Sequence, residues 1–138
     1  MPTLPQTGQG QSWSPPALLE QLKQDLGVDF AMELIHAFLD HLAATVPLLS
    51  AASAQGDLGT VAKQAHSIKG SARQLDVEII GGICAQIEAL AKENNLREVQ
   101  LLTPRLEEES KAVQRGFKAH LEGLSAPPPT GMAPQPRK

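Results

Sequence analysis

The 138-residue chain contains one cysteine, one tryptophan, three phenylalanines and no tyrosine. The single cysteine, Cys84, excludes an intramolecular disulfide framework and a cysteine-rich zinc site. Because aromatic side chains are so few, a core must be built from Leu, Ile, Val and Ala, and this composition favours helices over sheets. The net charge of −3 provides no basic field that would recruit nucleic acid.

Sequence motifs for several function classes are also missing. The chain shows no Walker A loop, no Gly-x-Gly-x-x-Gly and no Ser/His/Asp arrangement, so it has no evident way to bind ATP or to act as an enzyme with its own substrate. Residues 1–13 have neither the basic nor the apolar segment of a signal peptide, and no apolar run approaches 18 residues. We therefore expect a soluble, cytoplasmic protein without a membrane partner.

Composition divides the chain into three parts. Residues 1–13 are rich in Gln, Gly, Thr and Pro, and residues 125–138 contain five prolines and little that could be buried. Such segments cannot offset their ordering entropy with a core, so both are predicted to be disordered tails. Residues 14–124 are predicted to form one helical domain.

Within that domain, apolar residues recur at helical spacing between short polar turns. Residues suited to capping or turning precede each apolar stripe, at Ser14, Asp29, Asp57, Asp76 and Asn94–Asn95. Pro47 predicts a kink in the second helix, and Pro104 either kinks the last helix or restarts it with Thr103 as its cap. Short turns make neighbouring helices antiparallel. The predicted fold is an all-α, up-down four-helix bundle with a short additional N-terminal helix.

The segment Ala65-His66-Ser67-Ile68-Lys69-Gly70-Ser71 carries the clearest chemical signal. It places an imidazole, an ammonium and a missing side chain at i, i+3 and i+4, which is one face of a helix. A long side chain at position 70 would lean back over the ring of His66, and Gly70 leaves that ring open. Glycine inside a helix lowers stability by roughly 1 kcal/mol relative to alanine, so its presence at position 70 needs an explanation. Access of a phosphoryl group to His66 is the simplest explanation.

A carboxylate is predicted to lie behind this histidine. His66 precedes Val77 by 11 residues and Glu88 follows it by 11, so both lie about 16 Å from the turn between their helices. At that level Glu88 can accept a hydrogen bond from Nδ1–H of His66, which leaves Nε2 as a free nucleophile. Lys69 would neutralise charge on the transferred phosphoryl group.

The rest of this helix is locally basic within an acidic protein, which suits docking to an acidic pocket. Lys63 and Arg73 add positive charge, and Ser67 and Ser71 lie on the same helix. We expect these four residues to contact the partner. The other histidines lack such neighbours and are expected to be structural or exposed; they are His36, His41 and His120. No metal site is expected, because a di-iron bundle needs a second Glu-x-x-His pair beside the one that ends at His36.

These residues resemble a known family. The run from Ala65 to Ala72, continuing to Leu75, is similar to the signature of histidine-containing phosphotransfer (HPt) domains of bacterial phosphorelays, and so are Gly56-Asp57 before it and Cys84 with Ile87-Glu88 after it. The resemblance covers roughly residues 17–121. Two residues depart from it: Asp76 replaces a glycine that is common after the histidine helix, and Val77 replaces a small residue.

The resemblance implies a function. His66 would accept a phosphoryl group from an aspartate of one receiver domain, on a hybrid sensor kinase, and pass it to the aspartate of a response regulator. Lys69 matches the family's phosphate-stabilising lysine, Gly70 its access-giving glycine, and Glu88 a position that orients the histidine in some members. Mg²⁺ would sit on the receiver, and this chain, expected to be a monomer, would need no cofactor.

Two alternatives remain open from the residues alone. The chain could be a scaffold that binds receivers or kinases without carrying phosphate, or a structural helical adaptor in which His66 is dispensable. Acid-labile phosphate on the protein would separate the carrier from both.

Overall fold

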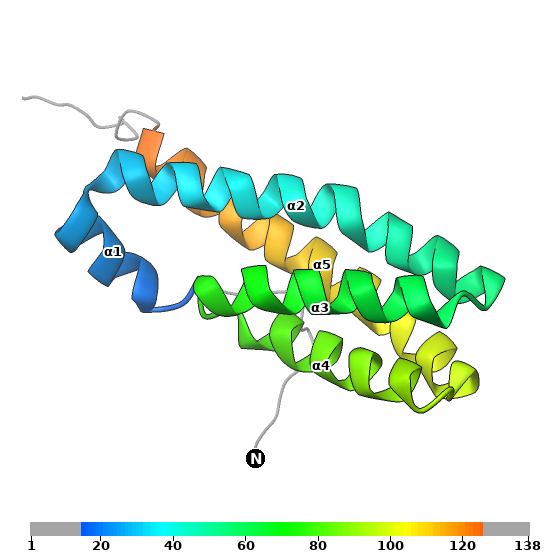
Figure 1. Cartoon of the computed structure of the whole chain (residues 1–138). Coiled ribbons are helices and arrows are strands. Elements are labelled where there is room, and N and C mark those ends of the chain that lie inside the picture. The colour runs from blue at the N-terminus through cyan, green and yellow to red at the C-terminus, as the bar shows by residue number, and fades with distance from the viewer. Residues whose placement is uncertain (1–14, 126–138) are drawn as a thin grey trace, which may run out of the picture.

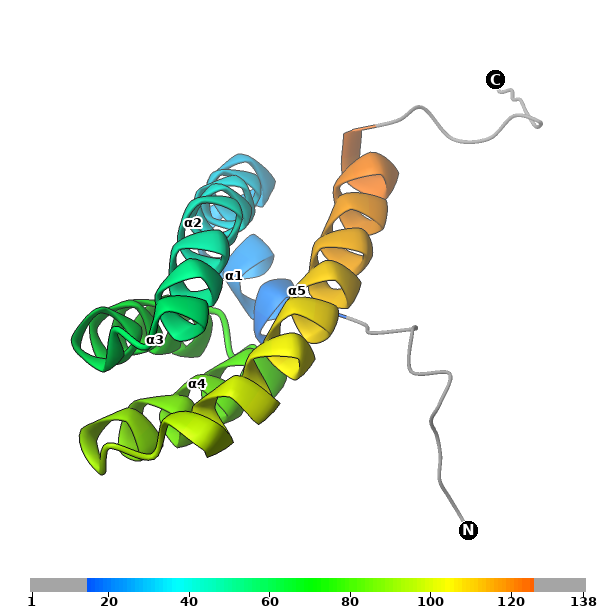
Figure 2. The same cartoon turned by 90° about the vertical axis from the view of Figure 1, so that its right-hand side faces the viewer.

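The computed structural model describes residues 15–125. Within that span the chain forms five helices and no strand: α1 (Leu18–Leu26), α2 (Val28–Gln55), α3 (Leu58–Gln74), α4 (Glu78–Lys92) and α5 (Leu96–Ser125). Helices α2 to α5 alternate in direction and each packs against two of the others, while α1 lies against α2 (Figure 1). Figure 2 shows α3 beside α2 and α4, and α5 beside α4, and α5 also packs against α2. The predicted four-helix bundle with an additional N-terminal helix is confirmed.

The core is aliphatic, as the composition predicts. The apolar stripe of α2 is buried throughout and consists of Ile35, Phe38, Leu42, Val46 and Leu49. Leu58 of α3, Leu90 of α4 and Leu102 of α5 are only partly buried and pack against this core. Phe38 of α2 meets Phe117 of α5 edge to face, with ring centroids 5.9 Å apart. In the described part of the chain, α2 is the one helix long and apolar enough to cross a membrane. Its apolar stripe is occupied by packing within the bundle, which is typical of a core helix.

The turn between α2 and α3 follows the prediction. Gly56 ends α2 in the left-handed conformation, with φ of 77°. The carboxylate of Asp57 then accepts hydrogen bonds from the amide and the hydroxyl of Thr60, which caps α3. These hydrogen bonds hold the pKa of Asp57 below its usual value. A capped, well-defined start fixes where along α3 each later residue lies.

The turn between α3 and α4 differs from the prediction. Asp76 does not cap α4: its φ is 60°, and α4 begins at Glu78 without a side-chain cap. The amide of Val77 donates to the carbonyl of Ala72 at 2.8 Å and closes the end of α3. This closure needs a left-handed residue at position 76, which explains why a glycine would suit that position. The two helices are therefore joined by a three-residue turn, Leu75 to Val77.

Other helix boundaries also need correction. The first helix begins at Leu18, after Pro15, and α2 begins at Val28, with Gly27 rather than Asp29 before its first residue. Both long helices continue through their prolines. Thr103 does not restart α5, because it is buried inside that helix and its hydroxyl donates to the carbonyl of Val99. Ser14 and both predicted tails lie outside the described residues, apart from Ser125 at the end of α5.

Candidate functional site

His66 stands on the outer side of α3. Its neighbours Ala65 and Ile68 are fully buried and anchor this turn of the helix in the core. The imidazole itself is 70% exposed. Since successive helical residues are about 100° apart, burial of Ala65 places His66 at the edge of the core stripe, as the sequence predicts. The ring is accessible to a partner and is supported from behind.

The support comes from Glu88 on α4. The two helices pack side by side, and Oε2 of Glu88 lies 3.0 Å from Nδ1 of His66. An ionised carboxylate can only accept a hydrogen bond, so Nδ1 carries the proton in this contact. The other ring nitrogen, Nε2, then keeps its lone pair. The predicted register of these two residues across the turn is confirmed.

Two lysines keep Glu88 ionised although its side chain is nearly buried. The ammonium of Lys69 donates to Oε1 at 2.6 Å, and that of Lys92 lies 3.0 Å from Oε2. The hydrogen bond from Lys69 is the main reason why the pKa of Glu88 is lowered to about 2, and Lys92 and His66 lower it further. Burial acts in the opposite direction and would raise this pKa. Lys69 was expected to face a phosphoryl group. Its ammonium lies on Glu88 instead, so that role stays a prediction.

Lys92 was missed by the sequence analysis. It lies four residues after Glu88 on the same helix, a spacing at which a glutamate and a lysine meet. The ammonium shares Oε2 with the ring of His66. The spacing alone could have identified this contact.

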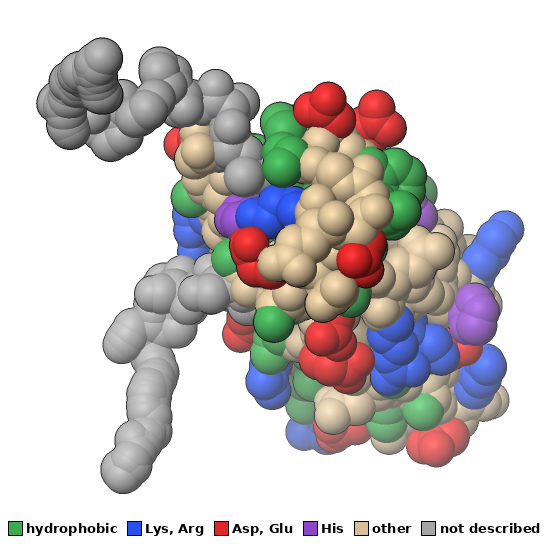
Figure 3. Space-filling view, turned by 90° about the vertical axis from the view of Figure 1, so that its left-hand side faces the viewer, with side chains coloured by type: hydrophobic (Ala, Val, Ile, Leu, Met, Phe, Trp, Pro, Cys, Tyr) green, Lys and Arg blue, Asp and Glu red, His purple; other side chains and the backbone are tan. Residues whose placement is uncertain are grey.

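Access to the ring is open on the side of Gly70. A Cβ added to Gly70 would meet no atom within 4 Å. Lys63 is exposed and lines, with Ala62, Glu88 and Lys92, a shallow hollow of about 400 Å³ beside His66. Figure 3 shows Lys and Arg side chains gathered near a histidine on one side of the surface.

Arg73 lies apart from the His66–Glu88 pair. It pairs with Glu78 at 3.6 Å, and its side chain covers Gly81. A Cβ on Gly81 would come within 3.3 Å of the Arg73 side chain, whereas one on Gly82 would meet nothing. The close approach is therefore confined to Gly81, where the Arg73 side chain makes it.

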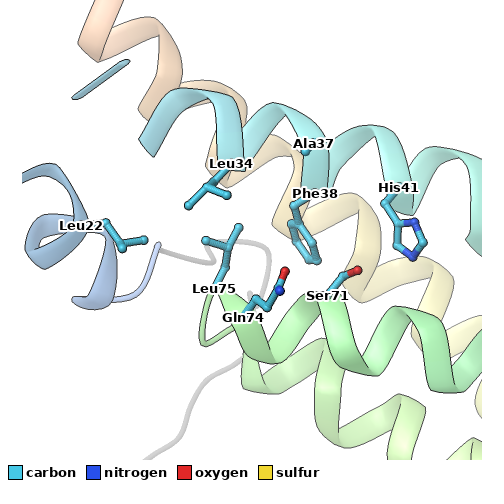
Figure 4. Close-up of a pocket in the computed structure, with 8 residues that line it drawn as sticks. All are labelled: Leu22, Leu34, Ala37, Phe38, His41, Ser71, Gln74 and Leu75. Atoms are coloured by element: carbon cyan, nitrogen blue, oxygen red, sulfur yellow. The ribbon is translucent and has the colours of Figure 1, made fainter. Parts of the chain in front are cut away.

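Ser67 and Ser71, which were expected to contact a partner, lie beside α2 and a groove. Ser67 Oγ lies 3.0 Å from Nε2 of His41 on α2, which was not expected to take part in any site. Ser71 and His41 line a groove of about 430 Å³ between α1, α2 and α3, beside the histidine face. Figure 4 shows Leu22, Leu34, Phe38 and Leu75 lining this groove. The groove offers apolar contact next to an exposed polar face.

The remaining chemical groups stay apart from this site. His36 is exposed on α2, and His120 of α5 lies 3.4 Å from Lys23 of α1. Burial raises the pKa of the Cys84 thiol to about 12, and such a thiol is inert. Among residues 15–125, no three His, Cys, Asp or Glu side chains are placed to hold a metal ion.

Comparison with known proteins agrees with the geometry. No curated protein and no solved structure gives a significant match to the chain. A family model described as the Hpt domain matches residues 33–123, which include the histidine helix, the Glu88 helix and most of α2 and α5. Because this match spans more than half of the 138 residues, the chain belongs to the Hpt domain family of two-component phosphorelay proteins.

Proposed function

We propose that this chain is a phosphorelay carrier that accepts a phosphoryl group on Nε2 of His66 from a receiver-domain aspartate and passes it to the aspartate of a response regulator. One observation supports this more than any other. A largely exposed imidazole has its Nδ1 held 3.0 Å from a carboxylate, which directs the lone pair of Nε2 outward.

The transfer requires a nucleophile and a group that stabilises the positive charge formed on the imidazole ring. Nε2 attacks the phosphorus of the aspartyl phosphate, an N–P bond forms, and the P–O bond to the donor carboxylate breaks. The donor carboxylate leaves with the electron pair of that bond. The ring keeps its proton on Nδ1 and gains a positive charge, which Glu88 stabilises. Lys69 adds positive potential behind the ring from its place on Glu88.

The same geometry supports the return step. Transfer to a second aspartate breaks the N–P bond, and the electron pair returns to Nε2. Glu88 again holds Nδ1–H, so the ring is left ready for another cycle. No residue of this chain needs to bind ATP. The Mg²⁺ that this chemistry uses is expected to bind to the receiver domain and not to this chain.

Docking of a receiver is proposed on the face that surrounds His66. Gly70 leaves room for close approach, and Lys63 and Arg73 supply exposed positive charge that suits an acidic pocket. Ser67 and Ser71 connect this face to the groove between α1, α2 and α3. A partner could therefore combine charged contacts at the nucleophile with apolar contact beside it.

The test uses a receiver domain carrying labelled aspartyl phosphate. We expect the wild-type chain to take up the label as an acid-labile phosphate and His66→Gln to take up none, because within residues 15–125 His66 is the one histidine that combines exposure with a carboxylate on Nδ1. His36→Gln is the matched control, since His36 is an exposed histidine on another helix. Circular dichroism should show that both variants fold.

The result also separates the carrier from a scaffold. A scaffold would bind the receiver, measurable by calorimetry, without taking up label. Label retained by a folded His66→Gln variant would refute the assignment of the nucleophile.

A further inference from the structure

Two lysines approach Glu88 from opposite ends of the His66–Glu88 pair. Lys69 follows His66 by one turn on α3, and Lys92 follows Glu88 by one turn on α4. Long helical side chains lean toward the N-terminus of their own helix. Because α3 and α4 are antiparallel, the two ammonium groups converge on the same carboxylate from opposite sides.

The two lysines differ in how they are held. Lys69 is 23% exposed and lies 2.6 Å from Oε1, an oxygen that it does not share with His66. Lys92 is 66% exposed, and its 3.0 Å contact is to Oε2, which already accepts from His66. If Lys69 left Glu88, a mostly buried side chain would lose its anionic partner. If Lys92 left Glu88, its exposed ammonium would be hydrated by solvent. Lys92 is therefore the cation that can move.

The space beside the ring lies on the same side as Lys92. The hollow of about 400 Å³ at His66 is lined by Lys92 and Lys63, and Lys69 does not line it. A phosphoryl group brings close to two negative charges and three acceptor oxygens to Nε2. The buried negative charge of Glu88 needs one cation beside it, and the negative charge of the phosphoryl group needs a second cation.

We infer that Lys92 is the residue that binds the phosphoryl oxygens on His66, while Lys69 stays on Oε1 and keeps Glu88 ionised and in place. This inference rests on the proposed function. When the phosphoryl group arrives, the Lys92 ammonium exchanges Oε2 for a phosphoryl oxygen and keeps all its protons. The bonds made and broken at phosphorus are those of the transfer described above.

The experiment compares four lysine-to-glutamine variants, at positions 92, 69, 63 and 118, for phosphoryl uptake from a labelled receiver and for stability in urea. Lys92→Gln should slow uptake on the order of tenfold, as expected for loss of one stabilising cation at a partly solvated site, with little change in stability. Lys92→Arg should recover most of the rate. Lys69→Gln should lower stability more than Lys92→Gln does.

Lys118→Gln is the matched control for the rate, because Lys118 is an exposed lysine of α5, the helix that packs against α2 and α4, and its uptake rate should stay within about twofold of wild type. Lys63→Gln separates docking from phosphoryl binding, because Lys63 lines the same hollow and belongs to the proposed docking face. In ³¹P spectra of the phosphorylated chains, the phosphohistidine signal should move in Lys92→Gln and stay in place in Lys63→Gln. A purely structural role of Lys92 would not move that signal.

Two outcomes overturn the inference. Uptake at the wild-type rate by Lys92→Gln would do so, with Lys69 then the phosphoryl-binding cation if its variant is folded and slow. An equal loss in Lys92→Gln and Lys63→Gln would assign the effect to a general basic field during docking. Absence of label on the wild-type chain would instead refute the proposed function itself.

Discussion

Replacing Glu88 with glutamine measures how much the charged cluster behind His66 stabilises the fold. Glutamine has nearly the same shape as glutamate, so the change removes a charge from the bundle without opening a cavity. In the wild-type chain Lys69, Lys92 and His66 all contact this carboxylate. In the variant the half-buried ammonium of Lys69 loses its anionic partner.

The size of the effect follows from the pKa of Glu88. A carboxyl whose pKa is about 2 in the folded chain and 4.5 in its ordinary state contributes about 3 kcal/mol to stability at neutral pH. Solvent screens the contribution of the exposed Lys92, so we expect Glu88→Gln to lower the free energy of unfolding by about 2 kcal/mol at pH 7.

The sign of the pH dependence is also fixed. Because the folded pKa lies below the unfolded one, the contribution of Glu88 is complete above pH 4.5 and is lost as the pH falls toward 2. Protonated glutamate and glutamine are both neutral, so the two chains should converge in stability near pH 2. Other carboxyls titrate in both chains and cancel in the difference.

Urea unfolding of both chains between pH 7 and pH 2.5, followed by circular dichroism, provides the measurement. Equal stability of the two chains at pH 7 would refute the reasoning, because the cluster would then be too solvated to matter. A difference that persists unchanged at pH 2.5 would refute it as well, since its origin would not be the charge of Glu88.

Three further substitutions, at two positions, test backbone features near the site. Asp76→Gly should raise the free energy of unfolding by about 0.5–1 kcal/mol, because the φ of 60° at Asp76 suits glycine better than a residue with a Cβ; urea unfolding measures this, and no gain would contradict the argument. Gly70→Ala should also stabilise the chain, by up to about 1 kcal/mol, since a Cβ fits there without contact and alanine favours the helix. Gly70→Leu should slow phosphoryl uptake from a labelled receiver by obstructing docking, and an unchanged rate in a folded variant would show that access to His66 does not depend on Gly70.

Much of the site could be predicted because α3 and α4 are regular and joined by a short turn. Counting 11 residues on either side of Val77 brought His66 and Glu88 to the same level, and their hydrogen bond confirms it. The prediction needed only the rise of a helix and the position of the turn. It held although the turn itself was misjudged, because a local change at Asp76 does not alter the length of either helix.

What the sequence left open depends on conformations and on contacts between distant helices. Asp76 has the composition of a helix cap, and only the backbone shows that it adopts the left-handed conformation instead. Contact between His41 and Ser67 depends on how α2 is rotated against α3, which no short turn fixes. The position of the Lys69 ammonium depends on which nearby anion binds it most strongly. Residue spacing does not predict the relative strengths of these contacts.

Within residues 15–125, the side chains that line the hollow at His66 and those that contact Glu88 come from a single helical hairpin, α3 with α4. These groups thus lie within about one quarter of the chain, while α1 and the first half of α2 form one wall of the neighbouring groove. On the proposed function, substitutions on that wall would change which receiver fits without displacing His66. If the proposed function holds, a chain built this way could be redirected between signalling partners while keeping its phosphate-carrying residues unchanged.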